Sequence, residues 1–198
     1  MADFTILTVC TGNICRSPLA HLLLRDGLAD LGVTVHSAGV GALVDRGMPD
    51  QSLAIARSLG IVDAEAHRAR QITADMVREA DLILPMAREH RAAIVELVPR
   101  ASAKTFTMRE FGRIASHITD DALAQAVQDG ATPADRMRLA VEEIGFSRGE
   151  VPPPASLEDD NIVDPYRQSD DVYAQSTAQL TPAVQQAVSL LRKAAGGL

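Results

Sequence analysis

Aromatic residues and cysteine are scarce in this chain, and acidic residues outnumber basic ones. Its 198 residues include no tryptophan, two tyrosines, four phenylalanines and two cysteines, and the formal net charge is −7. A core must therefore be built mainly from Leu, Ile, Val and Ala. Two cysteines are too few for a disulfide scaffold, which favours a reduced, cytoplasmic setting. An acidic chain also argues against nucleic acid or an anionic membrane as its main partner.

Long apolar segments and metal-binding patterns are missing as well. No hydrophobic run approaches the ~18 residues of a membrane span. The N-terminal segment MADFTILTV carries Asp3 and no basic region, so we predict no signal peptide. There is no CxxC or HExxH pair, and the histidines are scattered. We therefore expect no metal, no cofactor and no membrane partner.

Short apolar segments alternate with segments of helical spacing, and this alternation indicates the fold class. The apolar segments are typical of strands buried on both faces and comprise Phe4–Val9, Val33–His36, Asp81–Pro85 and Lys104–Thr107. Strands that alternate with helices form βαβ units around a parallel sheet. We therefore predict an α/β fold: a single three-layer domain over residues 1–198, with a four-stranded parallel sheet and helices on both faces.

Several helix boundaries carry their own signals. Ser17 and Pro18 suit the N-cap and the first position of the helix that follows the first strand. Gly145 is a candidate stop for a later helix. Pro182 predicts that the last helix, which reaches about Ala195, is kinked or split.

The segment VCTGNICRSP joins the first predicted strand to the first helix. Open α/β sheets place ligands beyond the carboxyl ends of their strands, and the free amides of a helix start bind phosphate. Gly12 and Asn13 tolerate the dihedrals that a cradle of amides needs, and Arg16 can hold two phosphate oxygens at once. These groups should stabilise Cys10 as a thiolate, which is an attacking nucleophile when it faces a phosphate. We predict a phosphate-binding loop at this point.

The Cys-x5-Arg spacing of this loop is shared by cysteine phosphatases. The fuller string VCTGNICRSP resembles the low-molecular-weight protein tyrosine phosphatase family, which also includes arsenate reductases and arginine phosphatases. Four further segments follow in the order of the family: HSAGV at 36–40, HRARQIT at 67–73, ADLILPM at 80–86 and VDPY at 163–166.

Residues 116–160 depart from this resemblance, because the region looks longer than in compact members. We expect an extended helical and loop insertion here, which is either a lid beside the site or a stabilising appendage.

The resemblance implies roles for the matching residues. Cys10 would be the nucleophile, Ser17 would donate its hydroxyl to the thiolate, and Arg16 would clamp the phosphate. Asp164 would be the general acid and would later act as the base that activates water. On sequence alone, Asp159 and Asp160 compete with Asp164 for this role. The implied phosphate-binding residues are Thr11, Gly12, Asn13, Ile14, Cys15 and Arg16.

Supporting roles follow from the same resemblance. Asn13 would brace the loop with help from Ser37, and Tyr166 would line one wall of the pocket. The two cysteines themselves, which share one short loop, suggest a further role: Cys15 would be a redox partner that captures oxidised Cys10 as a disulfide, with simple packing beneath the loop as the alternative. We interpret Arg68 and Arg70 as surface charges.

Two departures from the family concern the pocket walls. Many members carry an aromatic residue in the loop after the SAG segment, but residues 40–49 contain none. A second aromatic often follows the Asp-Pro-aromatic motif, where this chain has Arg167. We therefore expect one wall to be missing and aryl groups to be bound loosely.

The resulting functional hypothesis is a phosphatase that hydrolyses phosphomonoesters, with a phosphorylated protein or a small aryl phosphate as partner and inorganic phosphate as product. Ile14 favours phosphotyrosine, since the related arginine phosphatases resemble CTGNTC, with threonine at this position. The alternatives are an arsenate reductase or a protein arginine phosphatase on the same scaffold, and a non-catalytic module that binds phosphoproteins or senses oxidants.

Overall fold

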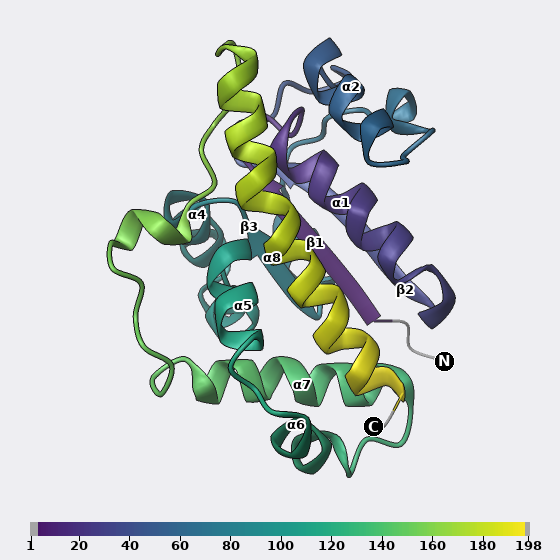
Figure 1. Ribbon diagram of the computed structural model, residues 1–198, viewed down its shortest axis with the longest axis vertical. Coiled ribbons are helices and arrows are strands. Elements are labelled where there is room, and N and C mark those ends of the chain that lie inside the picture. The colour runs from purple at the N-terminus through teal and green to yellow at the C-terminus, as the bar shows by residue number, and fades with distance from the viewer. Residues whose placement is uncertain (1–3, 197–198) are drawn as a thin grey trace.

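The computed structural model describes residues 4–196, and Figure 1 shows a parallel sheet with helices on both faces. The sheet has three strands in the order β2-β1-β3, with bounds Phe4–Cys10 for β1, Val33–Gly39 for β2 and Leu82–Pro85 for β3. Both pairings are parallel, and the register sets Cys10 opposite Gly39. The carboxyl ends of β1 and its neighbours therefore meet at one edge of the sheet.

Helices account for most of the remaining chain. They are α1 (Arg16–Gly27), α2 (Asp50–Ser58), α3 (Ala74–Glu79), α4 (Arg88–Leu97), α5 (Met108–Ala115), α6 (Asp120–Val127), α7 (Pro133–Ser147) and α8 (Asp170–Gly196). Short 3-10 turns lie at Ala29–Leu31, Ala64–Ala66, Pro99–Lys104 and Leu157–Asp160. None of the helices between residues 4 and 196 has the length and apolar character needed to cross a membrane.

The predicted fourth strand at Lys104–Thr107 is wrong. Thr105 forms a single isolated bridge with Ile83 of β3. Two residues later, the Thr107 side chain caps α5 in a capping box with Glu110. Because this cap starts α5 directly after Thr107, the chain leaves the sheet after one residue pair. The sheet therefore has three strands.

The central strand β1 sends alternate side chains to two separate cores. Phe4 and Ile6 pack on one face with residues of α1, α5, α7 and α8. Leu7 and Val9 pack on the other face with residues of α3 and α4. This period of two, with helices on both faces, produces the three layers that the apolar segments predicted.

Three predicted helix boundaries differ from the structure. α1 begins at Arg16 with Cys15 at the N-cap, so Ser17 lies inside the helix and does not cap it. Gly145 lies inside α7 and does not end it. α8 continues through Pro182 without interruption, so the predicted split is wrong.

The region 116–160 contains α6, α7 and a loop, and its two helices lie at the end of the sheet away from Cys10 (Figure 1). Arg138 of α7 pairs with Asp81 at 2.9 Å, and the other carboxylate oxygen of Asp81 accepts the Thr5 amide at 2.8 Å. α7 is thus tied to the start of β1 and β3. This position favours the appendage over the lid, while the extent of a single domain with an insertion stays a prediction.

Candidate active site

The loop between β1 and α1 surrounds the sulfur of Cys10. Cys10 is the last residue of β1 and is only 2% exposed. The Asn13 amide donates to Cys10 Sγ at 3.3 Å, and Ser17 Oγ lies 3.0 Å from the same sulfur. Asn13 reaches this place because its backbone adopts a left-handed conformation with φ 54°. The sulfur therefore faces two groups from which a thiolate can accept hydrogen bonds.

Asn13 holds the loop through both polar atoms of its side-chain amide. Its Nδ2 donates to Ser17 Oγ at 3.0 Å, and its Oδ1 accepts the Arg70 amide at 2.9 Å. The Arg70 side chain in turn donates from Nε to the Ser37 carbonyl at 2.8 Å. Ser37 thus supports the loop through Arg70 and its own backbone. The surface-charge prediction is wrong for half-buried Arg70, while Arg68 is exposed as expected.

Two histidines that the sequence did not single out also contact the loop. His67 Nε2 lies 2.7 Å from the Asn13 carbonyl, and burial lowers the pKa of His67. His90, 1% exposed, places Nε2 2.9 Å from Thr11 Oγ1. Burial, helped by the charge of Arg16, lowers the pKa of His90 to about 4. Both rings are therefore neutral near pH 7 and act as hydrogen-bonding supports.

Arg16 is buried beside the sulfur and is held at two of its three nitrogens. Nη1 donates to the Ile162 carbonyl at 3.0 Å, and Nη2 pairs with Asp164 Oδ2 at 2.7 Å. Nε is buried and has no hydrogen-bond partner among the described residues. A buried donor in this position is suited to an incoming oxyanion.

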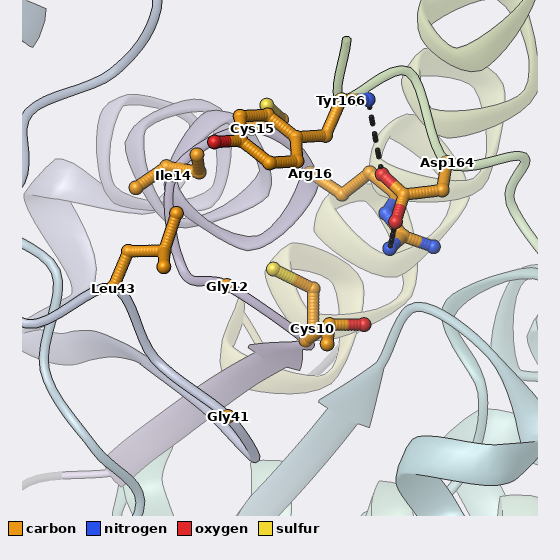
Figure 2. Close-up of a pocket in the computed structure, with 10 residues that line it drawn as sticks. Cys10, Gly12, Ile14, Cys15, Arg16, Gly41, Leu43, Asp164 and Tyr166 are labelled. Carbon is orange, nitrogen blue, oxygen red and sulfur yellow. Dashed lines mark hydrogen bonds and ion pairs between the residues drawn. The ribbon is translucent and has the colours of Figure 1, made fainter.

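Asp164 is the carboxylate that reaches this pocket. Its side chain is 51% exposed, and Oδ1 accepts the Tyr166 amide at 3.2 Å, as Figure 2 shows. The two competing acids are engaged elsewhere. Asp160 is buried against Arg113 at 3.3 Å, and Asp159 accepts the amide of residue 156 in a capping box. Of the three, Asp164 is the one that the structure places beside Arg16.

The pocket above Cys10 has apolar walls on two sides (Figure 2). Tyr166 and Leu43 both line it, and Ile14 lies between them. The prediction of a missing wall is therefore wrong, because Leu43 supplies an aliphatic wall in the loop that lacks aromatic residues. The full lining set is Cys10, Thr11, Gly12, Ile14, Cys15, Arg16, Gly41, Leu43, Asp164 and Tyr166.

The segment after β2 carries Leu43 to the pocket along the phosphate loop. The amides of Val40, Gly41 and Leu43 donate to the carbonyls of the residues at 10, 11 and 12, each at 3.0 Å. Gly39 permits this contact, since a Cβ at Gly39 would lie 2.4 Å from the backbone oxygen of residue 11. The two segments can approach so closely only with glycine at this point.

Arg167, which stands where many family members have a second aromatic residue, packs against the ring of Tyr166. The Arg167 guanidinium lies 5.1 Å from the centre of the Tyr166 ring. Arg167 adopts a left-handed backbone conformation with φ 61°. A cation over an aromatic face is a stabilising contact, so Arg167 supports this wall.

Cys15 lies on the buried side of the loop. Its sulfur is 3.9 Å from the Tyr173 hydroxyl, and burial raises the pKa of the Cys15 thiol to about 11. Nearby Cys10 adds a smaller contribution in the same direction. Cys15 is therefore a neutral thiol near pH 7, close to the nucleophile.

Among residues 4–196, no three His, Cys, Asp or Glu side chains are grouped so that they could hold a metal ion.

The comparison with known families assigns the chain. The family model described as low molecular weight phosphotyrosine protein phosphatase matches residues 5–123. The chain belongs to this family. The resemblance drawn from VCTGNICRSP is thereby confirmed, and the matched residues include the loop, β1 to β3 and α1 to α5.

Individual relatives agree with this assignment. The chain is 46% identical over 101 residues to the low molecular weight protein-tyrosine-phosphatase Etp of Escherichia coli K12, over 51% of this chain and 66% of Etp. The alignment thus spans just under two thirds of that curated relative. The solved tyrosine phosphatase Wzb from Escherichia coli K30, in complex with sulphate, is 28% identical with a TM-score of 0.65, covering 96% of this chain and 98% of that one.

The solved neighbours also include a phosphatase of different specificity. The YwlE arginine phosphatase from Geobacillus stearothermophilus is 27% identical with a TM-score of 0.65, covering 96% of this chain and 94% of that one. Overall structural similarity therefore does not separate tyrosine from arginine phosphatases.

Proposed function

We propose that this chain hydrolyses phosphomonoesters, with protein phosphotyrosine as substrate, through a phosphocysteine intermediate. The observation that carries the proposal is the convergence of Cys10 Sγ, the Arg16 guanidinium and the Asp164 carboxylate on one pocket. A nucleophile, a clamp for two oxygens and a proton donor are the three groups that this reaction needs.

Phosphate binding precedes the chemistry. The loop amides and Arg16 Nε and Nη2 would take the phosphate oxygens, while Nη1 keeps its 3.0 Å bond to the Ile162 carbonyl. The phosphate would then replace Asp164 at Nη2. This exchange frees the carboxyl group to turn toward the leaving oxygen, which lies on the open side of the pocket.

In the first step, the Cys10 thiolate attacks phosphorus in line with the leaving oxygen. The Sγ–P bond forms as the P–O bond to tyrosine breaks. Asp164 gives its proton to the phenolate oxygen, so that neutral tyrosine departs.

In the second step, water attacks the phosphorus of phosphocysteine. Asp164, now a carboxylate, takes a proton from this water. The S–P bond breaks, which releases inorganic phosphate and restores the thiolate. Ser17 Oγ, 3.0 Å from Cys10 Sγ, would donate to the sulfur as it leaves.

The test of the nucleophile compares wild type with Cys10→Ser. Hydrolysis of 4-nitrophenyl phosphate should be abolished, while inorganic phosphate should still bind by calorimetry because Arg16 and the loop amides remain. Hydrolysis by Cys10→Ser at the wild-type rate would contradict the proposal.

The test of the acid uses aryl phosphates whose phenols differ in acidity. Asp164→Ala should lose roughly 10²–10⁴-fold in rate for poor leaving groups, and less for good ones, because only a poor leaving group needs a proton. An equal loss across the series would remove Asp164 from the acid role.

Arsenate reduction is the weaker alternative. Thioredoxin-coupled reductases of this scaffold relay electrons through two further cysteines, and this chain has only Cys10 and Cys15. Thiol-dependent arsenate reduction by the purified protein would overturn the preference for hydrolysis.

A further inference from the structure

The segment Asp160–Asp164, here called the acid loop, is held by side chains from the two helices beside it. Arg113 of α5 pairs with the Asp160 carboxylate at 3.3 Å, and Arg109 of α5 donates to the Asn161 carbonyl at 3.0 Å. From α8, Gln179 Oε1 accepts the Val163 amide at 2.9 Å. These three side chains also line one groove between α5 and α8.

Two of the contacts on the acid loop act on a single peptide plane. The carbonyl of Ile162 and the amide of Val163 belong to the same planar unit. Arg16 Nη1 donates to this carbonyl at 3.0 Å, and Gln179 accepts from this amide at 2.9 Å. Both polar groups of this peptide, which lies just before Asp164 in the chain, are therefore hydrogen-bonded to side chains. One residue earlier, the Ile162 amide donates to the Met86 carbonyl at 2.9 Å, which anchors the loop to the end of β3.

Arg16 and Gln179, the two side chains that bond this peptide, differ in their other contacts. Arg16 also pairs with Asp164 and, under the proposed function, with the phosphate. Its Nη2 must therefore exchange Asp164 for phosphate during the reaction, while Nη1 keeps the Ile162 carbonyl. Gln179 lies on the far side of the peptide plane, on a continuous helix, and does not line the pocket above Cys10. Of the two contacts on this plane, Gln179 is therefore the one whose side chain takes no part in the exchange at Arg16 Nη2.

We propose that Gln179 is a positioning residue that sets the orientation of Asp164 for proton transfer; this inference rests on the proposed phosphatase function. An unpaired amide in this half-buried place is costly, and the side-chain oxygen of Gln179 satisfies the Val163 amide. Loss of the acceptor should leave phosphate binding intact and misplace the acid. The defect should therefore grow as the leaving group becomes poorer.

The experiment measures kcat/KM of Gln179→Met for 2,4-dinitrophenyl, 4-nitrophenyl and unsubstituted phenyl phosphate. Methionine keeps the length of glutamine and removes the acceptor. We expect a loss of about tenfold for phenyl phosphate and under about twofold for the dinitrophenyl ester, since general-acid catalysis contributes only where a proton is needed. Affinity for inorganic phosphate, measured in the Cys10→Ser background with and without the second change, should not move.

Matched variants separate positioning from a general structural effect. Gln179→Glu retains an acceptor oxygen and should restore most of the rate on phenyl phosphate. Gln186→Met removes an exposed glutamine of the same groove, about two turns further along α8, and should match wild type. Gln179→Asn, which shortens the side chain by one methylene, should show the same selective loss and replaces Gln179→Met if that variant does not fold.

The outcomes distinguish this inference from the proposed function. If wild type hydrolyses none of the aryl phosphates, the proposed function fails. If wild type is active and Asp164→Ala is selective for poor leaving groups, but Gln179→Met and Gln179→Asn lose equally on all three esters or on none, the positioning role is overturned.

Discussion

Ile14 is buried in a small apolar cluster with Tyr166, Tyr173 and Ala69, at the side of the pocket where a substrate ring would enter. Its branched side chain lines the pocket beside Leu43 and presents no hydroxyl. Aromatic contact with Tyr166, of perhaps ~0.5–1.5 kcal/mol, then favours phosphotyrosine over phosphoarginine. Phosphoserine should be poor, because its short stem cannot bring the phosphate to the depth of Cys10.

Substitution of Ile14 provides the test of this preference. Wild type should have its highest kcat/KM on a phosphotyrosine peptide, compared with matched phosphoarginine and phosphoserine peptides. Ile14→Thr should shift the ratio toward phosphoarginine, since it removes an apolar contact and adds a hydroxyl. A wild-type preference for phosphoarginine, or an unchanged ratio in Ile14→Thr, would refute the role given to this residue.

Cys15 gives a second prediction at this scale, with a dependence on pH. The thiolate is the species that captures an oxidised cysteine, and burial raises the pKa of Cys15 to about 11. If Cys15 protects Cys10, activity regained with reductant after a peroxide pulse should be greater in wild type than in Cys15→Ala. The difference should widen from pH 7 to pH 9, as the thiolate fraction of Cys15 rises. Equal recovery at every pH would leave Cys15 with a packing role only.

Individual residues also show where sequence reasoning stops. Cys10, Arg16 and Asp164 could be selected because their side chains belong to recognisable motifs. The contact of His90 with Thr11 joins residues 79 positions apart, and no local pattern predicts such a pair. Arg70 was misread for a related reason, since the groups that bury its charged side chain lie on β2 and in the phosphate loop.

At the scale of elements, patterns with a local cause were predictable. The apolar segment that became β1 appears where the sequence indicated. The cap expected at Ser17 failed because its hydroxyl is engaged by Cys10 and Asn13. The fourth strand failed because the cap at Thr107 begins α5 too early for a ladder to form. Competing side-chain contacts, not weak propensity, account for these errors.

The junction between β2 and the phosphate loop yields a prediction for Gly39→Ala. A methyl group there would lie 2.4 Å from a backbone oxygen of the phosphate loop, which cannot rotate away as a side chain can. We expect a loss of about 1–3 kcal/mol in the free energy of unfolding, as for other overpacked sites, and a lower affinity for inorganic phosphate. Urea denaturation and calorimetry measure the two effects.

Gly41→Ala is the matched control for this change, because nothing lies within 4 Å of a Cβ at Gly41. Its free energy of unfolding should stay within about 0.5 kcal/mol of wild type, as for ordinary surface substitutions. Similar losses in both variants would show that the close approach at Gly39 has no special importance.

At the scale of the whole molecule, one buried and one half-buried histidine predict how stability depends on pH. Burial lowers the pKa of His90 and of His21 from 6.5 to about 4. Between pH 4 and pH 6.5, these two histidines are protonated in the unfolded chain but stay neutral in the folded protein. Stability is therefore full above pH 6.5 and falls as the pH drops toward 4. For His90, the loss is on the order of 3 kcal/mol.

Substitution of His90 isolates its share of this dependence. The free energy of unfolding of His90→Gln should fall less steeply between pH 6.5 and pH 4.5 than that of wild type, with part of the slope kept by His21. Urea denaturation at a series of pH values measures both slopes. Identical slopes would mean that His90 does not titrate in this window. Exposed carboxylates whose pKa is lowered by arginine, such as Asp63, act below this range.

The separation between the phosphate loop and α6–α7 divides the molecule into two parts with different freedom to change. One end of the sheet carries the reacting groups of the pocket, and the opposite end carries α6 and α7, which Arg138 joins to Asp81. Insertions, charge changes or a fused domain at α6 and α7 would alter heat tolerance and solubility without moving the reacting atoms.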